Sequence, residues 1–448
     1  MQKSCELRTF LSTMKVLALI LLLPCLYAED EFYRDRNLVC FYNSDGVKLP
    51  IKDLTLAVQF CTHLIYGYAG IRGDNYEAHS LNEELDIKKN HFTEVTSLKS
   101  KYPKLKVLLS VGGDRDIDEK HPNKYIELLE AGSESQKGFA KSALSLVKTY
   151  GFDGLDLAYQ FPKNKPKQVH STLGAALESV KKFFTGDSVV DPNAEKHKEE
   201  FISIAREVKD VLHPNGFLLS LTVLPNVNST WYFDIPKLNG LVDFVNLATF
   251  DFLTPERNPE EADYTASLIG LTSQDRLPHL NVLFQTDYWM KEFPVTKINL
   301  GIPAYGNAWK LTEESGNTGK PIVQHTNGPA PAGPYTKKAG LLSYTEICTM
   351  LANVEDEIEK DVQSPIEAAN FGNYAYRPAK GSGHDGIWIS YDDLDTIQHK
   401  AMHADPLLGG VALFNLEYDD FGGVCSGKKF PVLRTIRKEL GLPLKWQD

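Results

Sequence analysis

The residues whose types and spacing could do chemistry lie between positions 152 and 162, in the run Phe-Asp-Gly-Leu-Asp-Leu-Ala-Tyr-Gln-Phe-Pro. A helix-like segment precedes this run and a polar loop follows it, which predicts a buried strand of an α/β protein. Alternate side chains of a strand share one face. The residues that share the more polar face are Gly154, Asp156, Ala158 and Gln160.

Polar residues at the C-terminal tip of a buried strand are typical of the active site of a (β/α)8 barrel. A hydrolase would use carboxylates there, but this chain has the methyl group of Ala158 and the neutral amide of Gln160. An amide can donate a hydrogen bond but cannot transfer a proton at neutral pH. The alternative interpretation is a cluster of acids that caps a helix or a turn.

Eight short apolar segments alternate with helical patterns and predict one closed α/β barrel, a TIM barrel. They cover residues 37–42, 62–69, 106–111, 152–159, 217–223, 242–249, 297–303 and 409–416. The interval 163–200 is longer than a crossover requires, and so is 307–388. The second predicts a small α+β insertion domain between strands seven and eight, with the barrel formed by residues 29–306 and 389–448.

The N-terminus has the pattern of a secretory signal. Lys15 precedes eight consecutive apolar residues, and cleavage after Ala28 would remove residues 1–28, with Met14 as an alternative start of translation. The apolar run is too short to cross a bilayer. We therefore expect a secreted protein without membrane insertion. The net charge of −11 argues against nucleic acid and anionic membranes as partners.

Four cysteines remain after removal of the signal: Cys40, Cys61, Cys348 and Cys425. An even number in an oxidising compartment predicts two disulfides, with three possible connectivities. Cys40 and Cys61 lie in or beside neighbouring strand-like runs, which favours the pairs Cys40–Cys61 and Cys348–Cys425. No Cys-x-x-Cys and no His pair at ligand spacing occurs, so we expect no metal and no cofactor. The sequon that begins at Asn228 predicts N-glycosylation.

Five short motifs occur in chain order at the ends of predicted strands. They are Ser-Val-Gly-Gly at 110–113, Asp-Gly-Leu-Asp at 153–156, Thr-Phe-Asp at 249–251, Gly-Ile-Pro-Ala-Tyr-Gly at 301–306 and Leu-Glu-Tyr-Asp-Asp-Phe at 416–421. Together they resemble glycoside hydrolase family 18 over nearly all of the chain. Within that family, the insertion that includes residues 162–166 resembles the insect imaginal disc growth factors, which are secreted chitinase-like proteins.

Hydrolases of this family carry Asp-x-x-Asp-x-Asp-x-Glu on strand four. The resemblance places the first two acids at Asp153 and Asp156. Where the family has the Asp that orients the substrate's acetamido group, this chain has Ala158, and where the family has the Glu that donates the proton, it has Gln160. Loss of general acid catalysis lowers a rate by about 10² to 10⁴. The resemblance therefore implies a degenerate, non-catalytic motif.

Sugar-binding members of the family stack Trp residues near the ends of strands one, three and eight. On this chain those positions are Asp45, Asp114 and Phe414. The remaining candidates for contact with a sugar are Tyr42, Asp251, Tyr305, Trp388 and Phe414. An aromatic side chain can stack on a sugar in a cleft or simply fill a core.

Two functions therefore remain open. The resemblance implies a secreted, non-catalytic growth factor that promotes cell proliferation through an unknown cell-surface receptor or matrix component, with a role in extracellular matrix or cuticle. The alternative is a lectin that binds chitin oligosaccharides weakly through the cleft of the barrel.

Overall fold

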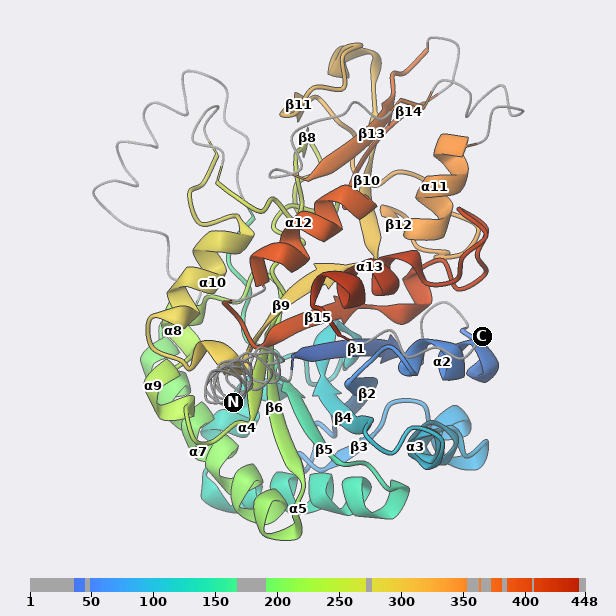
Figure 1. The fold of residues 1–448 in the computed structure, drawn as a ribbon. Coiled ribbons are helices and arrows are strands. Elements are labelled where there is room, and N and C mark those ends of the chain that lie inside the picture. Colours follow the sequence, from blue (N-terminus) through green and yellow to red (C-terminus); the bar gives the residue numbers. More distant parts are fainter. Residues whose placement is uncertain are drawn as a thin grey trace, which may run out of the picture.

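In the computed structural model, eight parallel strands close into a barrel that helices surround (Figure 1). The structure describes residues 36–44, 49–166, 191–270, 276–352, 362–363, 372–380, 385–404 and 407–442. The signal predicted at residues 1–28 and the side chain of Asp45 lie outside these ranges.

The strands follow one another around the barrel in chain order. They are β1 (Asn37–Asn43), β2 (His63–Ile71), β4 (Lys106–Gly112), β5 (Gly154–Ala158), β6 (Leu218–Val223), β7 (Phe244–Leu247), β9 (Ile298–Pro303) and β15 (Gly410–Phe414). β1 pairs in parallel with both β2 and β15, which closes the barrel. A short strand, β3 (Ala78–Ser80), adds to β2 in antiparallel orientation. Each predicted strand overlaps an observed one, and the predicted fold class is confirmed.

Helices pack around the strands. They are α2 (Ile51–Val58), α3 (His91–Ser97), α4 (Lys124–Glu130), α5 (Ser133–Tyr150), α7 (Ala194–Leu212), α8 (Ser229–Tyr232), α9 (Ile235–Leu238), α10 (Val282–Met290), α12 (Leu394–Ala404) and α13 (Pro431–Glu439). α5 buries Phe139, Ala143 and Val147 at helical spacing, and it ends at Gly151, where a φ of +74° suits glycine. Because α7 already begins at Ala194, the end of the predicted insertion 163–200 belongs to a barrel helix.

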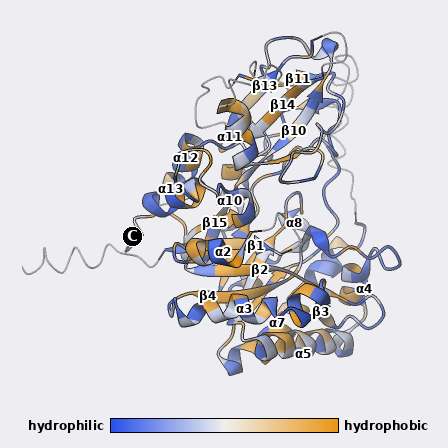
Figure 2. Ribbon diagram, turned by 90° about the vertical axis from the view of Figure 1, so that its right-hand side faces the viewer, coloured by the Kyte–Doolittle hydropathy of each residue, from blue (hydrophilic) through white to orange (hydrophobic). Residues whose placement is uncertain are grey.

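In the described part of the barrel, the core has two apolar layers, and the alternation of side chains along the strands decides which layer each residue joins. In β1, Val39 and Phe41 point into the barrel. Leu38, Cys40 and Tyr42 point outward, against the helices. Figure 2 shows this pattern over the molecule: the barrel strands are largely hydrophobic, whereas the outer helices also carry hydrophilic residues.

A second, antiparallel sheet lies between β9 and β15 in the chain, and Figure 1 shows it above the barrel. Its order is β12-β10-β14-β13. The strands are β10 (Tyr305–Leu311), β12 (Leu341–Ser343), β13 (Asn373–Arg377) and β14 (Gly386–Tyr391), and α11 (Tyr344–Ala352) accompanies them, with β8 (Glu261–Ala262) pairing β11 (Val323–Gln324) nearby. The sheet extends slightly beyond the predicted range 307–388 at both ends, because β10 starts almost directly after β9.

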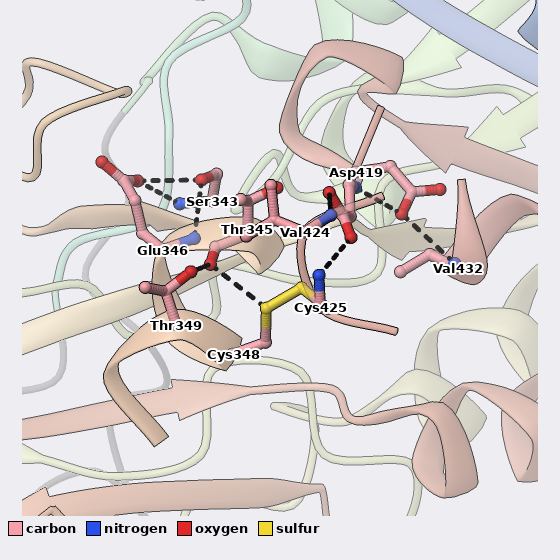
Figure 3. The surroundings of a disulfide bond; sticks show 10 residues. Ser343, Thr345, Glu346, Cys348, Thr349, Asp419, Val424, Cys425 and Val432 are labelled. Carbon is pink, nitrogen blue, oxygen red and sulfur yellow. Dashed lines mark hydrogen bonds between the residues drawn. A yellow bond between two sulfur atoms is a disulfide. The ribbon is translucent and has the colours of Figure 1, made fainter. Parts of the chain in front are cut away.

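The structure contains both disulfides that the sequence favours. Cys40–Cys61 and Cys348–Cys425 have Cα–Cα distances of 6.0 and 5.8 Å, within the usual range. The second pair joins α11 to the loop after β15, and Asp420 holds that loop by accepting the N–H of Cys425 at 2.7 Å. Figure 3 shows this disulfide and the hydrogen bonds around it. Because α11 directly follows β12, the bond links the part of the chain that forms the second sheet to the barrel.

Candidate functional site

A cleft of about 260 Å³ opens at the C-terminal ends of the barrel strands. Its walls come from the loops after several strands and from the start of the second sheet. This is where a (β/α)8 barrel usually places its site. The volume lies slightly below the range of about 300–1,000 Å³ that is typical of ligand pockets.

Asp156 lies beneath the cleft and does not line it. Its carboxylate is fully buried and accepts hydrogen bonds from Ser110 at 2.7 Å, from Ser220 at 2.7 Å and from Thr222 at 2.9 Å. Burial raises the pKa of Asp156, although the three hydroxyl groups act in the opposite direction. With its acceptor sites occupied by hydroxyl groups of β4 and β6, the strands on either side of β5, Asp156 holds the interior of the barrel together.

Asp153 lies at the other end of the barrel. It precedes β5, accepts the N–H of Val107 at 2.8 Å and forms an ion pair with Lys99 at 3.1 Å. The structure therefore separates the two acids of the motif. Asp153 supports the N-terminal end of the strands, far from the cleft.

Gln160 is turned toward the loop that follows β4. Its Nε2 donates to the carbonyl oxygens of Gly113 and of Asp116, the second at 3.2 Å. Both N–H groups of the amide are thus used within the chain, and Gln160 does not line the cleft. Ala158 is fully buried as the last residue of β5.

Three of the predicted sugar-contact residues, Asp251, Tyr305 and Phe414, do line the cleft. Asp251 accepts from the hydroxyl of Tyr305 and the amide of Asn307, both at 2.7 Å. Burial raises the pKa of Asp251, and these two bonds oppose the rise. The ring of Phe414 stacks on Phe41 at 3.9 Å between centroids and is only 5% exposed. Little of that ring is left for a sugar.

The other two candidates, Tyr42 and Trp388, do not line the cleft. Tyr42 points outward from β1 and bonds His91 on α3 at 2.9 Å. Trp388 is fully buried in the second sheet, opposite Trp309, and donates to the carbonyl of Gly319 at 2.7 Å. The orientation of Tyr42 could have been inferred from the sequence. Tyr42 and Cys40 lie on the same face of the strand, and the predicted Cys40–Cys61 disulfide places that face outside the barrel.

One segment along the cleft was not predicted from the sequence. Lys163 lies in the cleft and donates to both oxygens of Asp114 at 2.9 Å. The next residue, Asn164, donates its N–H to the carbonyl oxygen of Asn226 at 2.7 Å, and its own carbonyl oxygen accepts from Arg257 at 2.6 Å. We call residues 163–164 the strap. Its membership of an insertion was visible in the sequence, whereas nothing marked Arg257.

Three other expectations concern metal binding, membrane insertion and glycosylation. The described part of the chain holds no group of three His, Cys, Asp or Glu side chains that could bind a metal ion. In the same part, no helix has the length and apolarity to cross a membrane. Asn228 caps α8 by accepting from the N–H of Thr230 at 3.0 Å, and its glycosylation stays a prediction.

Comparisons with known proteins agree with this geometry. Residues 37–419 match the sequence model described as glycosyl hydrolases family 18. "Chitinase-like protein Idgf2" of Drosophila melanogaster is 60% identical over 93% of this chain and 98% of its own length. "Imaginal disk growth factor 6" of the same organism is 48% identical, over 90% of this chain and 93% of its own.

Solved structures show the same fold. A Group IV chitinase of Ostrinia furnacalis, in complex with allosamidin, has a TM-score of 0.74 and 26% identity, and covers 91% of this chain and 99% of its own. Human YKL-39, described as a pseudo-chitinase with retained chitooligosaccharide binding properties, has a TM-score of 0.69 and 25% identity, with 91% of this chain and 100% of its own covered.

Proposed function

Because this chain belongs to glycosyl hydrolase family 18 and, within it, to the chitinase-like proteins of the imaginal disc growth factor type, we propose that it is a secreted, non-catalytic growth factor. In this proposal it promotes cell proliferation by engaging a cell-surface receptor or matrix component and acts in extracellular matrix or cuticle. The barrel serves as a scaffold, and the cleft does not cleave chitin.

The observation that carries the proposal is the state of Gln160. It stands where the family's hydrolases have their proton donor, and both of its N–H groups are bonded to backbone carbonyls. Ala158, two residues earlier, has no group that could orient an acetamido substituent. General acid catalysis and support of the nucleophile are therefore missing together.

The neighbouring acids of the described chain are poor substitutes. Asp156 is enclosed by hydroxyl groups, and Asp251 is held by Tyr305 and Asn307. Burial raises the pKa of Glu417 to about 8, so this acid is protonated at neutral pH. Its carboxyl, however, bonds Asn415 at 3.0 Å and does not line the cleft.

The test combines a hydrolysis assay with a cell assay. The purified secreted protein should release no product from a fluorogenic chitobioside, and it should increase the number of cultured insect cells. An excess of chitotetraose should leave the cell response unchanged. Product release above the buffer blank would contradict the non-catalytic part, and no cell response would contradict the growth-factor part.

A second candidate function is a chitin-oligosaccharide lectin. The family likeness to YKL-39, with its described chitooligosaccharide binding, and the aromatic residues Tyr305 and Phe414 in the cleft favour it. Against it, Phe414 is almost fully covered, and the ion pair of Lys163 with Asp114 occupies the cleft. Calorimetry with chitotetraose separates the two: micromolar binding would favour the lectin, and millimolar or absent binding the growth factor.

A further inference from the structure

Four lysines lie within eight residues, at positions 99, 101, 104 and 106, with no acid among them, in a chain whose net charge is −11. The segment leads from a single helical turn (Leu98–Ser100) into β4. The segment is compact, because the N–H of Leu105 donates to the backbone carbonyl oxygen of Tyr102 at 2.9 Å. The four side chains therefore start from one short turn at the N-terminal end of the barrel, opposite the cleft.

Lys99 pairs with an acid, whereas Lys101 lies over the ring of Tyr102, with its ammonium 5.4 Å from the ring centre. Lys99 pairs with Asp153 at 3.1 Å and donates to the carbonyl of Gly151 at 2.6 Å, where it caps the C-terminus of α5. Lys101, Lys104 and Lys106 are exposed. No carboxylate of the described residues lies within 4 Å of their ammonium groups, so these three charges are available to a partner.

Two guanidinium groups of α13 extend the positive charge. Arg437 donates to the carbonyl of Phe60, and the guanidinium carbon of Arg434 lies 4.6 Å from the centre of the Phe60 ring. Two residues further on, Thr62 accepts the N–H of Lys106 at 3.1 Å. Two residues span at most about 7 Å, so α13 meets the turn closely. Figure 1 shows α2 between α13 and α3 on this side of the barrel.

The pKa of His63 reflects both its burial and the charges around it. Burial is the main cause that lowers this pKa to about 4, and the ammonium of Lys106 lowers it further. The carboxylates of Asp153 and Asp243 act in the opposite direction and have smaller effects. Asp153 is already paired with Lys99, and Asp243 with His213 at 3.3 Å. The ammonium of Lys106 therefore acts on His63 more strongly than either of these acids alone.

We propose that these five residues, Lys101, Lys104, Lys106, Arg434 and Arg437, form a basic surface that binds a sulfated glycan. Lys and Arg bind sulfate and phosphate groups through charge-assisted hydrogen bonds, and a short Lys-rich run is typical of polyanion-binding patches. The acidic whole molecule disfavours nucleic acid. The inference rests on the proposed extracellular location and gives the matrix partner its chemistry, on a face separate from the cleft.

The test measures binding of the intact secreted protein to immobilised heparin at NaCl concentrations between about 0.05 and 0.3 M. Over roughly this range, salt increasingly screens the attraction between exposed charges. The variant replaces Lys101, Lys104 and Lys106 with Gln. At about fivefold per lysine near a polyanionic surface, its affinity at physiological salt should fall roughly 100-fold. The slope of log K against log salt should become shallower by about 2 to 3, because fewer counterions are released.

A matched control makes the same change of charge elsewhere. Lys137, Lys141 and Lys196 are exposed on α5 and α7, and their replacement by Gln should leave binding unchanged. Replacement of the three surface lysines by Arg should retain it. The proposal would be overturned if both Gln variants lost the same affinity, or if the wild type did not bind heparin. It would also be overturned if the wild type bound desulfated heparin or phosphatidylserine vesicles as well as it binds heparin. The proliferation assay is read separately, so failure of either proposal is distinguishable.

Discussion

At the scale of single residues, the polar side chains near the cleft bond to neighbours in the same chain. Gln160 donates to two carbonyl oxygens of the loop after β4. Asp116 anchors that loop by accepting from Lys124 at 2.5 Å and from Tyr125 at 2.6 Å. Substitution of such a side chain should lower the free energy of unfolding, because it leaves the buried hydrogen-bond partners unpaired.

Gln160→Glu should lower the free energy of unfolding without creating a hydrolase. A carboxylate cannot donate to the carbonyls of Gly113 and Asp116, and the loss of these bonds costs about 1–3 kcal/mol. Urea unfolding measures the stability, and a fluorogenic chitobioside measures turnover. Ala158→Asp must accompany the change for any product to appear. Robust turnover by the single variant would show that the acetamido group needs no Asp here.

Glu417→Gln should flatten the dependence of stability on pH. Burial raises the pKa of Glu417 from 4.5 to about 8. Between these values the folded state holds a proton that the unfolded state releases, so the contribution of Glu417 to the unfolding free energy falls as pH rises. Gln does not titrate and resembles the protonated acid.

The difference between wild type and this variant should therefore change by up to about 1.4 kcal/mol per pH unit within that window. Urea unfolding at pH 5, 6, 7 and 8 measures it. Parallel stability curves for the two proteins would contradict a protonated Glu417.

At the scale of elements, the local sequence pattern predicted the strands well. It predicted poorly whether an individual aromatic side chain lies in the cleft or in the core. All eight barrel strands carry apolar runs that are buried on both faces, so their positions were visible. Whether an aromatic residue lines the cleft depends on its parity along the strand and on distant partners. Tyr42 meets His91, and Trp388 meets Trp309 and Tyr374, across long stretches of sequence.

The strap illustrates the same limit for the site. Lys163 reaches Asp114 over 49 residues, and Arg257 reaches Asn164 over 93. Neither contact has a local pattern, because each depends on how the closed barrel brings loops together. The replacement of the family's Glu by Gln160, by contrast, follows from the resemblance of one short segment, residues 153–160, to the family's motif.

The two disulfides should differ in their response to mild reduction. Cys40 and Cys61 are buried, whereas Cys348 and Cys425 are partly exposed. Reducing agent at low concentration should therefore reach Cys348–Cys425 first, because thiol–disulfide exchange requires access. Mass spectrometry of the alkylated native protein identifies the reacted cysteines.

Removing this bond as Cys348→Ser with Cys425→Ser should lower the free energy of unfolding by roughly 4 kcal/mol, since it closes a loop of 77 residues. The control is a conservative exchange such as Thr349→Ser, on the exposed side of α11. First labelling of Cys40 and Cys61 would contradict the predicted order.

At the scale of the whole molecule, the barrel and the second sheet share a buried joint. Lys400 on α12 donates to Asp392, which follows β14, and to the carbonyl of Ala266, each at 2.5 Å. Its side chain and that of Asp392 are almost completely buried. A charge pair at such a place requires both partners, since either one alone would stay buried without compensation.

Lys400→Met should destabilise the protein by about 3–5 kcal/mol, because it leaves the carboxylate of Asp392 uncompensated. Combining it with Asp392→Asn should recover part of that loss. Urea unfolding of wild type, single and double variants measures both effects. A single variant as stable as wild type, or a double variant less stable than the single one, would contradict a charged pair.

The two hydrogen bonds of Gln160 have a consequence for which residues can replace it. Once the amide holds the loop after β4, a return to Glu removes two hydrogen bonds and supplies no activity while Ala158 remains. Under the proposed function, the Gln160→Glu variant is then less stable than its parent and gains no activity in exchange. Stability therefore favours the amide of Gln160 over a carboxylate at this position for as long as Ala158 remains.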